Sequence, residues 1–116
     1  MRIVTELSEV NSLLDTYRGS YVQISMYNVS LKRLALKLSL PNNLEVLYLM
    51  GVACEKIKAK FTFTNLGLIV ISSFNQVTKE TTTIIKDEIS EFELTTSGGY
   101  SLGIGLESEF DFFLNR

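Results

Sequence analysis

Lys56–Ser73, KIKAKFTFTNLGLIVISS, is the stretch from which we predict the fold. Its first half alternates, with apolar residues at the odd positions from Ile57 to Phe63 and lysine or threonine between them. Successive strand side chains point to opposite faces, so this half predicts a strand with one apolar face and one wet face. The second half, Leu68–Ile71, is apolar throughout, which is typical of a strand covered on both faces.

The residues between the two halves predict how they pair. Asn65-Leu66-Gly67 is typical of a three-residue hairpin loop, whose glycine can take the left-handed conformation that such loops need. This loop would set Phe61 opposite Ile71. It would also set Phe63 opposite Ile69. A two-residue loop would instead shift the pairing by one residue and set lysines opposite these isoleucines. We therefore expect a central β-hairpin with both phenylalanines in the core.

The rest of the chain predicts one helix and several more strands. Thr5–Arg18 carries apolar residues at helical spacing, with Thr5 as the expected cap and Gly19 as a left-handed stop. Period-two alternation from Tyr21 to Met50 predicts a three-stranded meander. Its expected cross-strand pairs are Ile24 with Leu34 and Leu36 with Tyr48. The loop Ser97-Gly98-Gly99 predicts a further hairpin, which would pair Phe92 with Ile104 and Leu94 with Leu102.

Short strands joined by tight loops favour a mainly β protein, with α+β as the broader alternative. We predict an antiparallel β-sandwich or partly closed barrel of about eight short strands, with one N-terminal amphipathic helix. The alternative is one strongly bent sheet with the helix on its concave side. At 116 residues the chain is long enough for one core, so we predict a single domain over 1–116.

The composition excludes several classes of protein. A hydrophobic content of 46% excludes a disordered chain, and a formal charge of −2 gives no reason to expect nucleic acid as a partner. MRIVTELSEV lacks the apolar run of a signal peptide, and no stretch is long and apolar enough for a membrane helix. One cysteine fits a reducing compartment. We therefore expect a cytoplasmic protein without a membrane partner.

The residue types argue against an enzyme. The sequence has no histidine, the commonest neutral-pH base and metal ligand, so imidazole triads and His-containing zinc sites are excluded. Cys54 lies beside Glu55 and is interpreted as a small buried filler rather than a nucleophile. The glycines of Gly98–Gly105 lack the spacing of a phosphate-binding loop. We expect no cofactor and no metal.

Acidic residues gather in the last third of the chain, where eight of the 13 acids follow residue 79. The basic residues lie earlier, for example at Lys56, Lys58 and Lys60. In the predicted C-terminal hairpin, glutamates would face glycines and form a shallow acidic strip. The strip and the aromatic tail together are our candidate binding surface, which would steer a basic partner. This surface consists of Glu91, Glu93, Glu107, Glu109 and Asp111.

Four apolar residues have the opposite parity from the expected core face. They form the candidate self-association face: Leu47, Leu49, Leu68 and Val70. One short helix would not cover all of them, so we expect a homodimer through this face or through an exposed sheet edge.

Two function classes follow from these patterns. The first is a small non-enzymatic protein that binds another protein through a surface patch. The alternative is a β-barrel-like binder of a small apolar ligand, since the Phe and Leu positions would line a cavity if they did not fill it. A continuous exposed apolar patch favours the first class, and a closed internal void favours the second.

Overall fold

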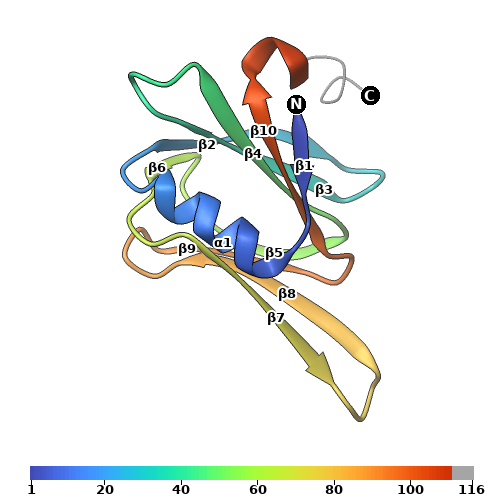
Figure 1. The fold of residues 1–116 in the computed structure, drawn as a ribbon. Helices are drawn as coiled ribbons and strands as arrows, with labels where there is room; N and C mark the ends of the chain where they lie inside the picture. Colours follow the sequence, from blue (N-terminus) through green and yellow to red (C-terminus); the bar gives the residue numbers. More distant parts are fainter. Residues whose placement is uncertain (111–116) are drawn as a thin grey trace.

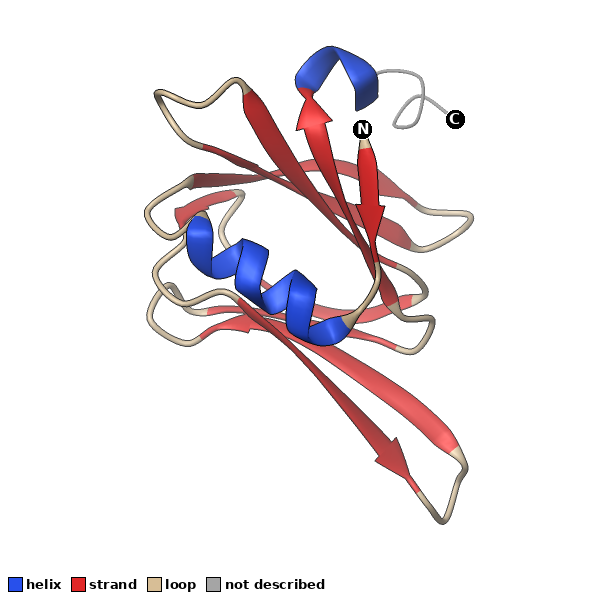
Figure 2. Ribbon diagram, in the orientation of Figure 1, coloured by secondary structure: helices blue, strands red, loops and turns tan. Residues whose placement is uncertain are grey.

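The chain folds as a mainly antiparallel, sandwich-like pair of β-sheets with one α-helix, in a computed structural model that describes residues 1–110 (Figures 1 and 2). Within that range it forms ten strands, the helix α1 and a short 3-10 helix, η1. The two sheets are separate and do not close into a barrel. The predicted sandwich with an N-terminal helix is therefore confirmed, and the single bent sheet is wrong.

The first sheet has the strand order β1-β10-β4-β3-β2-β6, and every neighbouring pair is antiparallel. In that order its strands are β1 (Arg2–Val4), β10 (Tyr100–Leu106), β4 (Glu45–Gly51), β3 (Arg33–Ser39), β2 (Tyr21–Asn28) and β6 (Thr62–Thr64).

The second sheet has the order β5-β9-β8-β7 and is also antiparallel. Its strands are β5 (Cys54–Lys58), β9 (Phe92–Thr96), β8 (Glu80–Asp87) and β7 (Ile69–Asn75). The β7–β8 hairpin extends beyond the rest of the sheet as an arm at the lower right of Figure 1.

Helix α1 (Leu7–Thr16) lies across the opening between the sheets, at the front of Figure 1. Its cap is Glu6 rather than the predicted Thr5, because the Glu6 carboxylate accepts hydrogen bonds from the backbone of Ser8 and Glu9. The predicted left-handed stop is confirmed, since Gly19 has a φ of 87°. The side chains of Val10, Leu14 and Tyr17 are buried, as the helical spacing predicted.

Two hydrophobic clusters cover opposite faces of β4. The main cluster lies between the sheets and under α1, and it takes Leu47 and Leu49 from this strand. The second lies on the outer face and takes Val46, Tyr48 and Met50. Phe110 from η1 (Glu107–Phe110) closes this second cluster, with its ring 4.4 Å from that of Tyr48. A central strand covered on both faces explains why nearly all of β4 is buried.

The predicted central hairpin is wrong. The chain from Lys56 to Ser73 forms three strands that pair with three different partners: β5 with β9, β6 with β2, and β7 with β8. The Phe61 side chain is therefore 85% exposed, and Ile69 and Ile71 are more than one-third exposed. Phe63 does pack on the core, where its ring stacks on that of Phe92.

Asn65, placed by the prediction in a hairpin loop, instead caps the C-terminus of α1. Its buried side-chain amide donates to the carbonyl oxygens of Leu14 and Tyr17, each at 3.0 Å. Its side-chain oxygen accepts from the backbone N–H of Leu68. Gly67 is not left-handed, in contrast to the prediction. A long-range cap of this kind has no local sequence signature, which is why the loop was misinterpreted.

The C-terminal hairpin is also wrong, because β9 and β10 belong to different sheets. β10 pairs with β1 and β4, so Ile104 lies opposite Leu47 and Leu102 opposite Leu49. The glycines of β10 make room for η1 and do not lie opposite Glu91 and Glu93, as the predicted hairpin required. A Cβ at Gly103 would come within 2.7 Å of the Phe110 ring.

The N-terminal meander forms with shifted registers. Ile24 lies opposite Leu36, with a bulge before Met26, and Leu36 lies opposite Leu49 rather than Tyr48. The one-residue slip between β3 and β4 moves the odd residues of β4 into the main core.

Candidate functional site

The predicted acidic surface is divided between the two sheets. Glu93 lies in β9 of the second sheet, and Glu91 lies in the preceding turn with a positive φ of 58°. Glu107 and Glu109 lie in η1, which packs on β10 of the first sheet at the top of Figure 1. Asp111 is outside the described residues. The acidic strip that the predicted hairpin would have formed is therefore absent from residues 1–110.

Both glutamates of η1 already have cationic partners. Glu107 forms an ion pair with Lys37, and Glu109 forms one with the N-terminal amine. The hydrogen bonds that the amine and the Leu106 backbone N–H donate to Glu109 lower the pKa of that carboxyl below its ordinary value. These contacts hold η1 against the residue that precedes β1 and against β3 of the first sheet.

The predicted self-association face does not exist as an exposed surface. Leu47 and Leu49 are fully buried, and Leu68 and Val70 are 2–3% exposed in the main cluster. The prediction failed because it assigned the opposite parity to the core.

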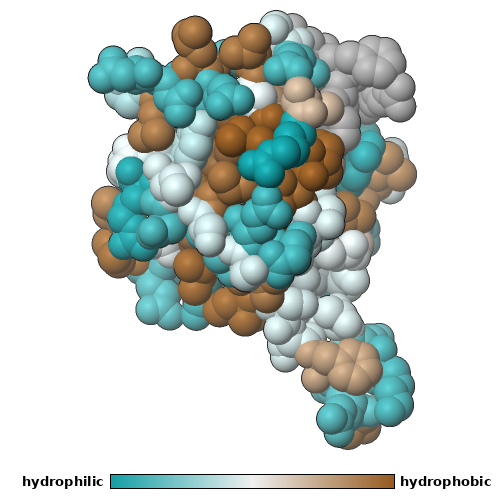
Figure 3. All heavy atoms as spheres, in the orientation of Figure 1, coloured by the Kyte–Doolittle hydropathy of each residue, from teal (hydrophilic) through white to brown (hydrophobic). Residues whose placement is uncertain are grey.

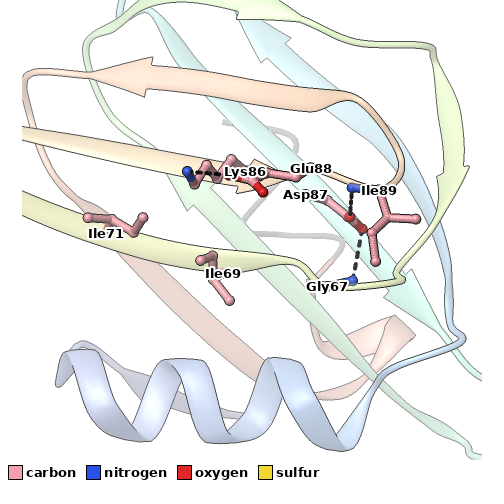
Figure 4. A pocket seen from close by; sticks show the side chains of 7 residues that line it. All are labelled: Gly67, Ile69, Ile71, Lys86, Asp87, Glu88 and Ile89. Carbon is pink, nitrogen blue, oxygen red and sulfur yellow. Dashed lines mark hydrogen bonds and ion pairs between the residues drawn. The ribbon is translucent and has the colours of Figure 1, made fainter.

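A hollow of about 250 Å³ lies where β7 meets the β8–β9 turn (Figure 4). Its polar centre is Asp87, whose fully buried carboxylate accepts four backbone hydrogen bonds of 2.9–3.1 Å. The donors are Leu66, Gly67, Ile89 and Ser90. On the rim, Lys86 forms an ion pair with Glu88. The charged groups of this hollow therefore have partners within the chain, and they join two turns together.

A second hollow of about 260 Å³ lies between the two sheets, and we call it the apolar groove. β2 and β3 supply one wall, and β5 and β9 supply the other. The residues that line it are Ile24, Tyr27, Leu34, Cys54, Glu55, Lys56, Ile57, Phe61 and Leu94. Seven of these nine are apolar or aromatic residues or the cysteine, which distinguishes the groove from the hollow at Asp87.

Two backbone hydrogen bonds fix the outer parts of the apolar groove. The Cys54 N–H donates to the Lys32 carbonyl at 2.8 Å, which joins β5 to the β2–β3 turn. The Ile24 N–H donates to the Phe61 carbonyl at 3.1 Å, which holds the segment before β6 beside β2. The backbone of Phe61 is thus fixed while its side chain remains exposed.

The groove has a buried floor and an exposed apolar rim. Leu34 and Leu94 form the floor and belong to the main core. On the rim, the side chains of Tyr27 and Ile57 are each about half exposed, in addition to Phe61. Clusters of exposed large apolar side chains mark interaction sites more often than isolated ones do.

Lysines accompany this rim in the sequence. Lys56 lines the groove, and Lys58 and Lys60 follow on the same segment with exposed side chains. Lys32 lies in the turn that is bonded to Cys54. Among residues 1–110 none of these four lysines takes part in an ion pair. Glu55 is the one acid in the lining.

Cys54 has a packing role in the groove wall. Its side chain is partly buried, and burial raises the pKa of the thiol above its ordinary value. A raised pKa keeps the thiol neutral and unreactive near pH 7. The interpretation of Cys54 as an inert filler agrees with this environment.

Sequence reasoning missed the groove because its residues come from strands that are distant in the sequence. The signal that was available is the alternation of Lys56–Phe61, which puts lysines and apolar residues on one exposed segment. Because Phe61 was predicted to lie in the core, this segment was not recognised as an exposed apolar surface.

A comparison of the chain with known protein families, curated proteins and solved structures found no match. Of the helices that the structure describes, none has the length and apolar character needed to cross a bilayer. Within residues 1–110 no three His, Cys, Asp or Glu side chains are grouped as metal ligands would be.

Proposed function

We propose that this chain is a non-enzymatic binding protein that holds an apolar segment of another protein in the groove between its two sheets. The observation that carries the proposal is the joint exposure of Tyr27, Ile57 and Phe61 around one hollow. Aromatic side chains over a partly formed pocket are typical anchors of protein interfaces. The backbone hydrogen bond at Phe61 adds rigidity, which reduces the entropy lost on binding.

The shape of the groove favours a protein segment over a small apolar ligand. Pockets for drug-sized ligands usually have volumes of about 300–1,000 Å³ and enclose most of the ligand. The groove is smaller and lies open between the walls. Its size suits one or two side chains of a partner that continues across the surrounding surface. Small apolar ligands remain an outcome that the experiment distinguishes.

The charge around the groove favours an acidic partner segment. Lys56 and Lys60 have no ion-pair partner among the described residues, so a carboxylate beside them would gain attraction without breaking an existing contact. Lys58 lies opposite Glu93 in the β5–β9 pairing, so we assign it no part in attracting the partner. Rim charges act mainly on the association rate, which should fall as salt is added. The partner we propose thus carries apolar residues flanked by Asp or Glu.

We further propose a cytoplasmic location and the absence of catalysis. One cysteine suits a reducing compartment, and a chain without histidine lacks the commonest general base. The groove itself contains Glu55 and Lys56 but no nucleophile with an orienting base.

Two synthetic amphipathic peptides test the proposed function. Both carry the same Leu and Phe residues on one helical face, and the other face is glutamate in one peptide and lysine in the other. We expect the glutamate peptide to shift the NMR amide signals of Cys54, Ile57 and Phe61, and to bind more weakly in high salt. The lysine peptide should bind at least about tenfold more weakly, because like charges across an interface are unfavourable.

Phe61→Ala supplies the test variant and Phe74→Ala the matched control, since both phenylalanines are more than half exposed. Loss of an aromatic anchor should weaken binding of the glutamate peptide by about tenfold or more. The control should bind as wild type does. Equal binding of both peptides by both variants would contradict the proposal. Binding of dodecanoate but of neither peptide would favour a small apolar ligand instead.

A further inference from the structure

The outermost strands of the two described sheets differ in how they are protected. β1 and β6 have only three residues each, and β5 carries lysines and a register irregularity after Cys54. Short strands, lysines and bulges are the features by which proteins prevent edge-to-edge pairing. β7 has seven residues with the sequence IVISSFN, with no charge, no proline and a continuous register. β7 is therefore the unprotected edge.

Part of this edge is already occupied by α1. The Asn11 side-chain amide donates to the Val70 carbonyl at 2.9 Å, and the Val70 N–H donates to the Asn11 side-chain oxygen at 2.8 Å. Asn11 thus makes the pair of hydrogen bonds that a neighbouring strand would make. Val70 must direct both backbone groups away from β8.

The same geometry identifies the backbone groups that have no neighbour. In an antiparallel pair, alternate residues direct their N–H and C=O to the same side, so Ser72 and Phe74 point outward as Val70 does. No side chain or turn in residues 1–110 bonds to the backbone of Ser72 or Phe74. These two residues lie on the projecting arm, which extends clear of the body of the molecule in Figure 3.

We propose that two copies of this chain pair through their β7 edges, antiparallel and related by a two-fold axis at Ser73. Ser72 of one copy then exchanges two hydrogen bonds with Phe74 of the other, and the symmetric pair forms likewise. The Asn11 contact ends the pairing at Val70. This register pairs the two outward-pointing residues of each strand, Ser72 and Phe74, that Asn11 leaves without a neighbour.

The composition of the free edge favours a second copy as the occupant. Residues 71–75 carry no charge, so a second copy meets no like charge opposite its own residues. A charged peptide would gain no ion pair along the same stretch. The pairing also brings the two Phe74 side chains, each 56% exposed, onto one face of the joined sheet. A neutral strand of this length therefore matches itself.

The dimer should be weak. The pairing contains two residues of each strand, and interfaces smaller than about 1,200 Å² belong to transient complexes. We expect monomers in dilute solution and dimers at high micromolar concentration.

Cysteine cross-linking tests the register in a Cys54→Ser background, which removes the natural thiol. Residues opposite each other in a pair without hydrogen bonds have Cα atoms about 4.5 Å apart, within disulfide range, so Ser73→Cys should cross-link rapidly. Ser72→Cys is the matched control. Its symmetry mate would lie about 8–9 Å away, too far for a disulfide. Equal cross-linking of the two variants would contradict the register.

Amide exchange and sedimentation test the pairing without a new thiol. The Ser72 and Phe74 amides should exchange quickly in dilute protein and at least about tenfold more slowly in concentrated protein, since pairing protects them. Ser72→Pro removes one outward N–H that β8 does not use, so it should abolish the dimer while leaving the fold intact. Ser72→Ala should dimerise normally. Monomer mass at all concentrations, or a Ser72→Pro dimer, would overturn the proposal.

Discussion

The apolar groove and the hollow at Asp87 have nearly the same volume, about 260 and 250 Å³, but they differ in whether their charged groups have partners within the chain. At the hollow, a buried carboxylate accepts four backbone hydrogen bonds, and the neighbouring lysine has its own glutamate. At the groove, aromatic and aliphatic side chains remain exposed beside lysines without ion pairs. A hollow whose groups have internal partners stabilises the fold. One whose groups have none is the better candidate for binding.

The comparison predicts that changes at the hollow reduce stability and that changes at the groove rim do not. Asp87→Ala should have the largest effect. A hydrogen bond to a charged group contributes about 1.5–3 kcal/mol, and bonds to one carboxylate do not add in full. Losing the four acceptor contacts should therefore lower the free energy of unfolding by about 3–6 kcal/mol, less than their sum. Urea denaturation measures the loss. Asp87→Asn, which keeps one acceptor oxygen, should lose less, and a wild-type midpoint for Asp87→Ala would contradict the structural role of the hollow.

The floor of the groove should behave as core. Leu94 is fully buried, so Leu94→Ala should lower the free energy of unfolding by about 2–5 kcal/mol through lost burial and a new cavity. Thermal and urea unfolding measure this effect. A change below about 0.5 kcal/mol, the range of ordinary surface substitutions, would show that the floor is not packed.

Cys54 reports on the wall of the groove through its pH dependence. Burial raises the pKa of the thiol in the folded chain, so the unfolded chain ionises first as pH rises. Cys54 therefore disfavours the folded state above the ordinary thiol pKa and has no such effect below it. Alkylation with iodoacetamide should be slower in the folded than in the urea-unfolded protein, and its rate should rise at higher pH. Equal folded and unfolded rates would contradict this environment.

The rim of the groove should tolerate substitution. Phe61→Ala should change the free energy of unfolding by less than about 0.5 kcal/mol, because its side chain is 85% exposed. Urea unfolding of this variant beside Leu94→Ala measures the contrast between rim and floor. A decrease in the free energy of unfolding of about 3 kcal/mol or more, the cost of truncating a buried phenylalanine, would show that Phe61 is buried in the core after all.

Local patterns predicted the sandwich, the helix and its stop at Gly19, because alternation and helical spacing arise from nearby residues. Pairing could not be predicted in the same way. Lys56–Ser73 was predicted as two paired strands, but it forms parts of three strands that pair with three different partners. The side chain of Asn65 caps α1 through carbonyl oxygens 48–51 residues earlier, a contact that no local pattern predicts. Register between β3 and β4 moved by one residue, which reversed the parity of Leu47 and Leu49.

The binding surface was less predictable than the fold. A cluster of acids in the sequence does not survive as one surface when β9 and η1 belong to different layers. The groove depends on Tyr27, Ile57 and Phe61 meeting across two sheets. Their exposure follows from tertiary pairing alone. The lysines on the same segment can be read from the sequence. The sequence alone does not show that they lie beside an exposed apolar groove.

The most direct test of the groove is a titration of the protein with the glutamate-faced peptide, followed by NMR at low and high salt. We expect chemical-shift changes confined to the groove and centred on Ile57 and Phe61, with an affinity that falls as salt rises. Phe61→Ala should lose this response while Phe74→Ala keeps it. Chemical-shift changes centred on Glu91 and Glu93, with no change at Phe61, would contradict the proposal that the apolar groove is the binding site.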